Sequence, residues 1–172
     1  TVSSFSAVPT PVDELGIDVM LAGSQKALAL PPGLALFTVS DAAFARAETL
    51  HDRGYYFDFL EFRKNHEDDM TPSTPCIHTI NGLRAKLDDI FAEGIETRYA
   101  RHERLNDLVA DWVIRNGFEF FAPKGFRSKT LTCISNNLEI DVSRFNQFLR
   151  KNHSLTINGG YGKIKGLTFR VS

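Results

Sequence analysis

A lysine that follows a short apolar segment is the residue best suited to covalent chemistry in this sequence. Residues 17–22 are apolar apart from Asp18, and Gly23, Ser24 and Gln25 separate them from Lys26. An amine at the end of a buried strand is held on a rigid element, where it can form a Schiff base with an aldehyde and later carry a proton. Partial burial would lower the pKa of such an amine and raise its neutral, reactive fraction.

The neighbours of Lys26 are compatible with a ligand but do not require one. Gly23 allows close approach of the backbone, and Ser24 and Gln25 carry groups that can hydrogen-bond a phosphate. A lysine in a turn after a strand is nevertheless most often an ordinary surface residue. The local pattern therefore leaves a nucleophile and a surface lysine both open.

The first part of the chain is predicted to place this lysine between two strands. Residues 17–22 and 34–39 indicate short strands, separated by breaks at 23–26 and at the Pro-Pro-Gly of residues 31–33. A helix is predicted from residue 42 to about 51, capped by Ser40 or Asp41. Residues 54–73 show no clear period, and the charged residues 61–69 are expected to be a solvated surface.

The middle of the chain predicts two consecutive helices. Apolar residues recur at helical spacing from about residue 77 to 116, and the charged residues fall between them, so one amphipathic face is expected. Gly94 should divide the run, and Gly117 stands where a C-cap belongs. The residues of the expected face are Ile80, Leu83, Leu87, Ile90, Ile95, Tyr99, Leu105, Leu108 and Trp112.

The last part of the chain predicts a helix packed on a small sheet. Strands are expected at residues 118–122, 129–135, 155–158 and 167–171. A helix over 141–151 should be capped by Asp141, with Val142, Phe145, Phe148 and Leu149 facing inward.

Composition excludes several classes of function. The 172 residues are 42% hydrophobic and carry a formal net charge of −1, with cations and anions interspersed, which argues against nucleic-acid binding. No apolar run approaches a membrane span. Two cysteines suggest a reducing cytoplasm, and the five histidines show no metal-ligand spacing, although Cys76 at a helix start should have a lowered pKa.

Separated motifs along the chain resemble those of the class V pyridoxal-phosphate-dependent aminotransferases, most closely the serine–pyruvate and alanine–glyoxylate branch. Gly-Ser-Gln-Lys-Ala-Leu at 23–28, followed by Pro-Pro-Gly at 31–33, is similar to the family's cofactor-lysine signature. The other matching patches are Val2-Ser3-Ser4, Gly16-Ile17-Asp18, Thr74-Pro75 with Gly82-Leu83, Gly159-Gly160-Tyr161-Gly162, Lys165-Gly166 and Phe169-Arg170-Val171.

The resemblance implies a catalytic lysine and a substrate-binding arginine. Lys26 would hold pyridoxal 5'-phosphate as a Schiff base and move the proton during the reaction. Arg170 would bind the α-carboxylate of the amino acid, a role that its planar, two-pronged guanidinium suits. An exposed strand arginine paired with a carboxylate is the alternative for Arg170.

Further cofactor contacts are implied at Ser4, Gln25 and Thr74. Thr74 matches a threonine that touches the cofactor phosphate of the neighbouring subunit, although a threonine before a proline is also a common helix cap. Thr71 stands where several relatives carry a phosphate-binding tyrosine, which puts that second contact in doubt. Ser4 and Gln25 match positions that line the cofactor or substrate pocket, but either residue could be a plain turn residue, as could Gly159 and Gly160.

By resemblance the fold class is α/β, the C-terminal part of a fold type I transferase. Residues 1–75 would be the end of a large domain with a mostly parallel seven-stranded sheet. Residues 76–93 would form a linking helix, and residues 94–172 a small α+β domain, with the cofactor between the two domains. Family members carry the aspartate that pairs with the pyridine nitrogen before the position of Thr1, so we expect residues upstream and expect these 172 residues alone to be inactive.

The function implied is transamination by a cytoplasmic homodimer with shared active sites. An amino group would pass from a small amino acid of the serine or alanine type to a 2-oxo acid such as pyruvate or glyoxylate. Two alternatives stay open: a lyase, desulfurase or epimerase that uses the same cofactor, and a non-catalytic α+β interaction module.

Overall fold

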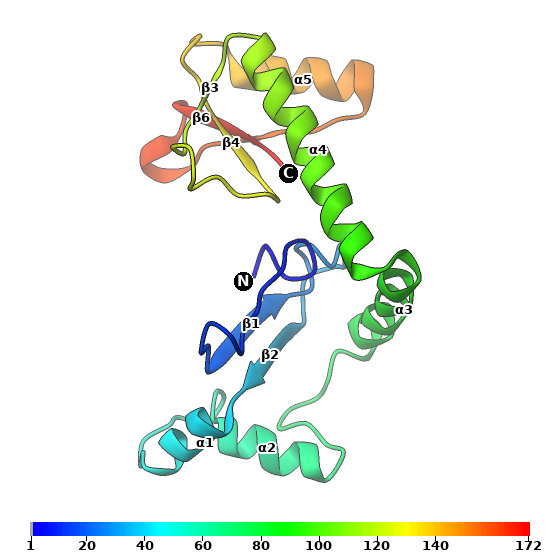
Figure 1. Cartoon of the computed structure of the whole chain (residues 1–172), viewed down its shortest axis with the longest axis vertical. Coiled ribbons are helices and arrows are strands. Elements are labelled where there is room, and N and C mark those ends of the chain that lie inside the picture. Colours follow the sequence, from blue (N-terminus) through cyan, green and yellow to red (C-terminus); the bar gives the residue numbers. More distant parts are fainter. Residues whose placement is uncertain (1) are drawn as a thin grey trace. The chain divides into compact units, whose positions relative to one another are not determined.

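The computed structural model describes residues 2–172, which divide into two compact units. The first unit extends to Ile95 and the second from Glu96 to Ser172. Each unit contains its own small sheet and its own helices (Figure 1). No helix among the described residues has both the length and the apolar character needed to cross a membrane.

The first unit is built on an antiparallel hairpin. Strand β1 (Val19–Gly23) pairs with β2 (Ala35–Val39), with Val19 opposite Val39 and Gly23 opposite Ala35. Both strands were predicted, but the parallel strands of the family's large sheet are not found among residues 2–95. The long connection between β1 and β2 contains Lys26, so the hairpin holds both ends of the segment that carries this amine.

Three helices complete the first unit: α1 (Asp41–Glu48), α2 (Phe59–Glu67) and α3 (Ile77–Glu93). The predicted cap of α1 is confirmed, because the Ser40 side chain accepts a hydrogen bond from the Ala43 N–H at 3.1 Å. No clear period was found over residues 54–73, yet Phe59–Glu67 forms the regular helix α2. Asp58 caps α2 through the Leu60 N–H at 3.0 Å, and Phe59 and Phe62 of this helix contact the ring of Phe37 in β2.

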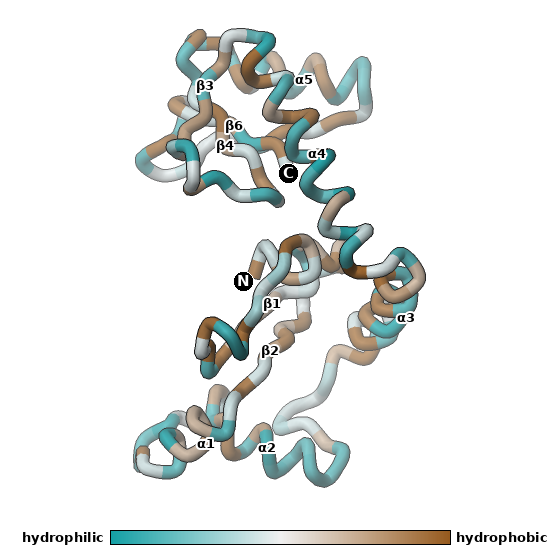
Figure 2. The backbone as a smooth tube through the Cα atoms, viewed as in Figure 1, coloured by the Kyte–Doolittle hydropathy of each residue, from teal (hydrophilic) through white to brown (hydrophobic). Residues whose placement is uncertain are grey.

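The predicted division of the long helical region is confirmed. Helix α3 ends at Glu93, Gly94 has a φ of 81°, and α4 runs from Ile95 to Arg115. A left-handed residue ends the first helix and allows the second to begin in a new direction. Figure 2 shows hydrophobic and hydrophilic residues alternating along α4. The expectation of one buried face is only partly met, because Ile80, Leu105 and Leu108 are exposed while Ile90 is buried.

The second unit is a four-stranded antiparallel sheet with helices packed on it. The strands β3 (Glu119–Phe120), β4 (Thr132–Ser135), β5 (Asn158–Gly159) and β6 (Thr168–Val171) follow the order β3-β4-β6-β5. Each observed strand is shorter than its prediction, and β5 begins only where the predicted strand 155–158 ends. The short 3-10 helix η1 (Gly162–Ile164) connects β5 to β6.

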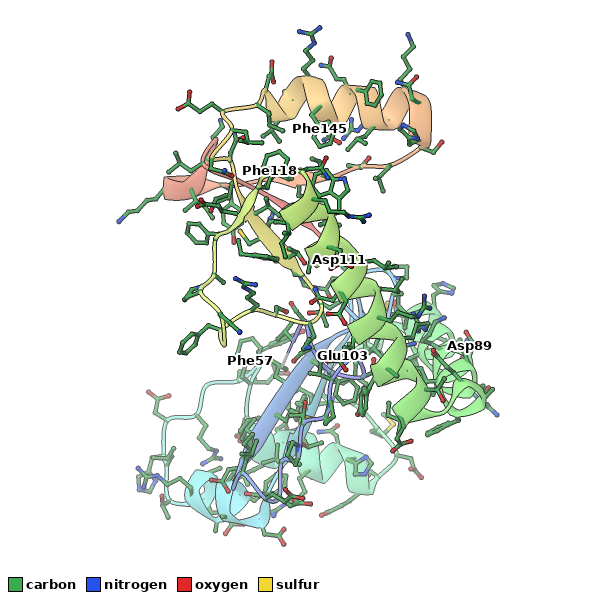
Figure 3. The ribbon with its side chains drawn as sticks, turned by 45° about the horizontal axis from the view of Figure 1, so that its top comes forward. Phe57, Asp89, Glu103, Asp111, Phe118 and Phe145 are labelled. Atoms are coloured by element: carbon green, nitrogen blue, oxygen red, sulfur yellow. The ribbon has the colours of Figure 1, made fainter. Side chains whose placement is uncertain are left out.

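Helix α5 (Val142–His153) covers one face of this sheet, and the predicted cap is confirmed by a 3.0 Å hydrogen bond from the Arg144 N–H to Asp141. Phe145 and Leu149 pack against the core, but the expectation that Phe148 faces inward is wrong because it is 54% exposed. Figure 3 shows Phe118 and Phe145 directed into the space between the helices and the sheet, where both rings contact Phe169. The fully buried centre of this core consists of Val113, Ile134, Ile157 and Phe169.

Candidate active site

Lys26 lies in a tight turn that begins where β1 ends. The Lys26 N–H approaches the Gly23 carbonyl at 3.4 Å, and the Lys26 carbonyl accepts from the Ala29 N–H at 2.8 Å. Ala29 has a φ of 54°, which closes the turn. The side chain of Lys26 is exposed in the described chain, so the partial burial expected from the sequence is not found here.

Ser24 fixes the turn from inside. Its side chain is fully buried, its hydroxyl donates to the Pro31 carbonyl at 2.8 Å, and the Leu34 N–H donates to the same oxygen at 3.3 Å. The Leu30 N–H also donates to the Ser24 carbonyl at 3.0 Å. The suggestion that Ser24 hydrogen-bonds a phosphate is therefore wrong, because both of its polar functions are used to hold the loop that follows Lys26.

Apolar packing supports the same turn. Leu28 is 1% exposed, two residues after an exposed lysine, so the turn has one buried side and one open side. Gln25 is exposed beside Lys26, and its side-chain oxygen lies where a Cβ at position 23 would come within 2.7 Å. Glycine at 23 thus leaves room for the side-chain amide of Gln25.

The start of α3 contacts the segment that follows the lysine turn. A Cβ at Gly33 would lie 3.8 Å from both Cys76 Sγ and Thr79 Oγ1, and one at Gly82 would lie 3.3 Å from Leu30. Cys76 occupies the N-cap position of this helix, so the interpretation of Thr74 as the helix cap is wrong. Thr74 is exposed just before the cap, and the Thr71 hydroxyl donates a hydrogen bond to the Ser73 carbonyl at 2.7 Å.

The direction of the pKa shift expected for Cys76 is found, but its chief cause differs from the expected one. The pKa of its thiol is lowered, chiefly by the hydrogen bond with the Thr79 hydroxyl, whose oxygen lies 3.0 Å from the sulfur. Ser4 is half-buried in the turns at the start of the chain, where its carbonyl accepts from the N–H groups of Ala7 and Val8 at 2.9 and 3.2 Å.

Arg170 belongs to the second unit, on β6, one of the two inner strands of its sheet. It lies opposite Cys133 of β4 and Asn158 of β5. Successive side chains of a strand point to opposite faces, so Phe169 enters the core while Arg170 points to the other face of the sheet. Its Nη2 donates to the Gly159 carbonyl at 3.5 Å, and its guanidinium carbon lies 5.3 Å from the centre of the Tyr161 ring.

The Nε of Arg170 is buried and has no hydrogen-bond partner within residues 2–172. An unpaired buried donor is costly, so this guanidinium has capacity for an acceptor that the described chain does not supply. That is the property required of a carboxylate-binding arginine. The exposed strand arginine paired with an acid is not what this geometry shows.

The residues named from the sequence thus fall into two sets. Lys26, Gln25, Ser4 and Thr74 lie in the first unit, and Arg170 lies in the second. Two pockets, with volumes of about 360 and 320 Å³, are lined by neither Lys26 nor Arg170. No group of three or more His, Cys, Asp or Glu side chains in the described part of the chain is arranged to hold a metal ion.

The family model for class V aminotransferases, described as "Aminotransferase class-V", matches residues 1–161. This chain belongs to the class V aminotransferases. The family uses pyridoxal phosphate. The primary amine of Lys26, exposed on a braced turn, and the Arg170 guanidinium with an unpaired donor both fit that cofactor and an amino acid.

Two aminotransferases from other organisms are similar to this chain over almost its whole length. An uncharacterized aminotransferase of Methanocaldococcus jannaschii is 37% identical over 173 residues, which covers 99% of this chain and 45% of the relative. The serine–glyoxylate aminotransferase of Arabidopsis thaliana is 35% identical over 175 residues, covering 99% of this chain and 43% of the relative. The chain therefore spans a little under half the length of these relatives.

A solved structure agrees in fold. The alanine–glyoxylate aminotransferase of a Nostoc species superimposes with a TM-score of 0.89 and 26% identity, covering 99% of this chain and 46% of that one. The α/β class expected from the sequence, as part of an aminotransferase fold, is confirmed by this match.

Sequence reasoning missed two residues that shape the candidate site. Ser24 was considered only as a possible phosphate contact, although a serine between a strand end and a double proline is well placed to hydrogen-bond the backbone instead. Tyr161 was noted only as part of a motif. The sequence did contain a signal for its contact with Arg170. Tyr161 is an aromatic residue in a glycine-rich turn, and the strand that follows carries the arginine.

Proposed function

We propose that the full-length protein is a pyridoxal-phosphate-dependent aminotransferase. It moves an amino group from a small amino acid of the serine or alanine type to a 2-oxo acid such as pyruvate or glyoxylate. The observation that carries this proposal is the exposed amine of Lys26 on a braced turn, in a chain that matches class V aminotransferases over residues 1–161. The names of similar proteins, serine–glyoxylate and alanine–glyoxylate aminotransferase, support the substrate class.

The cofactor, when bound, supplies an aldehyde that reacts with amines and a ring that withdraws electrons from the substrate. Lys26 would hold this group through its side-chain amine. The same Nζ would then carry the proton between the substrate α-carbon and the cofactor. The bracing by Ser24 keeps the returning amine within a narrow range of positions, which is the condition for efficient proton transfer.

Arg170 supplies the recognition of the substrate carboxylate through its guanidinium donors. Gln25 and Ser4 are assigned to the cofactor or substrate pocket, and Thr74 to the cofactor phosphate of a second subunit. The phosphate contact across subunits implies a homodimer with shared active sites, and the low cysteine content is the basis for assigning the protein to the cytoplasm. In domain terms, we assign residues 1–75 to the large domain, 76–93 to a linking helix and 94–172 to the small domain.

The test uses the full-length protein loaded with pyridoxal phosphate. Lys26→Ala should remove the absorbance band of the lysine-bound cofactor and reduce transamination by at least about 1,000-fold, because both the covalent link and the proton carrier are lost. Lys151→Ala, at an exposed lysine of α5, is the matched control and should keep both.

Product analysis separates the proposal from other reactions of the same cofactor. With a ¹⁵N-labelled amino donor and glyoxylate, the label should appear in glycine. Release of ammonia or of a racemised donor, with no labelled glycine, would show a lyase or an epimerase instead.

A further inference from the structure

The turn between β5 and β6 holds an aromatic ring against the guanidinium of Arg170. Tyr161 directly precedes η1, and the centre of its ring lies 5.3 Å from the Arg170 guanidinium carbon. A cation within about 6 Å of an aromatic ring is attracted by the negative charge of the ring face. The ring is 71% exposed, so it contributes little to the core.

The backbone around Tyr161 is rigidly folded. The Gly160 N–H donates to the Thr168 carbonyl at 2.8 Å, and a Cβ at position 160 would come within 2.1 Å of the Ile164 carbonyl oxygen. Only glycine allows this approach without displacement of the turn. The Tyr161 carbonyl in turn accepts from the Ile164 N–H at 3.3 Å.

The same turn supplies the second contact to the arginine. The Gly159 carbonyl accepts from Arg170 Nη2 at 3.5 Å, and Gly159 lies in β5 opposite Phe169 of β6. The guanidinium is thus held at one edge by a carbonyl and approached by a ring, while its Nε has no partner in the described chain. Fixing two sides of a planar fork reduces the entropy that is lost when it binds a carboxylate.

We propose that Tyr161 is a positioning residue for substrate recognition, because its ring holds Arg170 in the orientation that accepts an α-carboxylate. This inference rests on the proposed function and adds a determinant for carboxylate-bearing amino acids. Loss of the ring should weaken binding of the carboxylate and leave the attachment of cofactor to Lys26 unchanged.

The test compares Tyr161→Leu with Tyr161→Phe in the loaded full-length protein. Tyr161→Leu should raise the KM for the amino donor about 2- to 30-fold, the range expected for loss of a cation–π contact, with little change in kcat. Tyr161→Phe keeps the ring and should match the wild type. Equal increases in the KM of both variants would show that the effect comes from the Tyr161 hydroxyl group and would overturn the proposal.

A pair of carbonyl reagents gives a readout that does not depend on turnover. Aminooxyacetate and methoxyamine both react with the bound aldehyde, but only aminooxyacetate carries a carboxylate. Tyr161→Leu should slow the reaction with aminooxyacetate and leave that with methoxyamine unchanged. Equal slowing of both reagents would indicate general damage to the site, and no slowing of either would also contradict the proposal.

The outcome is distinguishable from failure of the proposed function. If Lys26→Ala removes the cofactor band and activity while Tyr161→Leu behaves as wild type, only the role of Tyr161 fails. If Lys26→Ala keeps both, the proposed function itself fails, whatever Tyr161 does. Thermal melting of both Tyr161 variants should match the wild type, since the ring is exposed.

Discussion

The two compact units differ in how much apolar surface they bury. The second unit encloses Val113, Ile134 and Phe169 completely, and three of its aromatic rings are in contact in the core. The buried apolar residues of the first unit are mostly alanines with Leu28 and Ile90, and polar Ser24 is buried with them. The unit that carries Lys26 is therefore the less well packed of the two.

The hairpin of the first unit shows the same contrast. Val19 and Leu21 alternate along β1, so they share one face of the hairpin, and they are 41% and 46% exposed. The buried Ala22 lies on the other face. A core of small side chains beside an exposed apolar strand face stabilises a unit weakly. The second unit therefore has a large enough apolar core to fold on its own, whereas the first unit does not.

Separate expression of the two units should give the largest effect. Residues 96–172 should unfold in one cooperative thermal transition, because their apolar core is complete, whereas residues 1–95 should show no cooperative transition. Circular dichroism during heating is the measurement. A sharp thermal transition of residues 1–95 alone would show that the first unit folds independently and contradict this difference between the units.

Truncation of the central ring of the second core should come next. Phe169→Ala should lower the free energy of unfolding of residues 96–172 by about 3–5 kcal/mol, since it removes a fully buried ring that touches Phe118 and Phe145. Denaturant titration measures the change. Phe126→Ala, at an 82% exposed phenylalanine of the same unit, is the control and should have almost no effect.

Loss of the Ser24 hydroxyl, which holds the turn after β1, should destabilise the protein less but should also lower its activity. Ser24→Ala leaves the Pro31 carbonyl and Leu34 N–H without their partner and should cost about 1–3 kcal/mol of stability in the full-length protein. Transamination should fall further than stability explains, because the turn that carries Lys26 is loosened. An unchanged kcat in a destabilised Ser24→Ala protein would show that the Ser24 hydrogen bonds support folding but not catalysis.

The smallest effect concerns acid. The carboxyl pKa values of Asp58 and Glu103 are both lowered, by hydrogen bonds from Arg53 and Lys129 respectively. A carboxyl group with a lowered folded-state pKa contributes stability at neutral pH that is lost as the pH falls from its unfolded pKa through its folded pKa.

The Asp58 side chain is 14% exposed and that of Glu103 is 59% exposed, so solvent screens the Glu103 pair more strongly. Asp58→Asn should therefore flatten the acid side of the stability profile of the full-length protein more than Glu103→Gln does. Thermal melting between pH 3 and 7 is the measurement. The reverse order would show that exposure does not govern these pairs.

Local signals in the sequence predicted much of the fold correctly. The caps at Ser40 and Asp141 and the break at Gly94 depend on one residue and its immediate neighbours, so pattern alone identified them. Helix α2 was not predicted, although Asp58 and Glu61 stand at capping-box spacing. Its apolar residues Phe59 and Phe62 contact Phe37, which is distant in sequence, so no local period marks the helix. Phe148 fits the helical period but lies beyond the edge of the core.

The candidate site was predicted in the same uneven way. Lys26 and Arg170 were both named from the family resemblance, and the class V family model covers Lys26 but ends at residue 161, before Arg170. The roles of Ser24 and Tyr161 could not be predicted, since a serine that braces a loop and one that binds phosphate have the same local sequence, and the contact between Tyr161 and Arg170 depends on how β5 pairs with β6.

We propose Lys26 as the covalent attachment point for the cofactor, and this is the assignment to test most directly. Borohydride reduction of the loaded full-length protein fixes the attached group, and proteolysis with mass spectrometry then locates it. A pyridoxyl group is expected on the peptide that contains Lys26. A loaded protein whose label is found on a different lysine would contradict it.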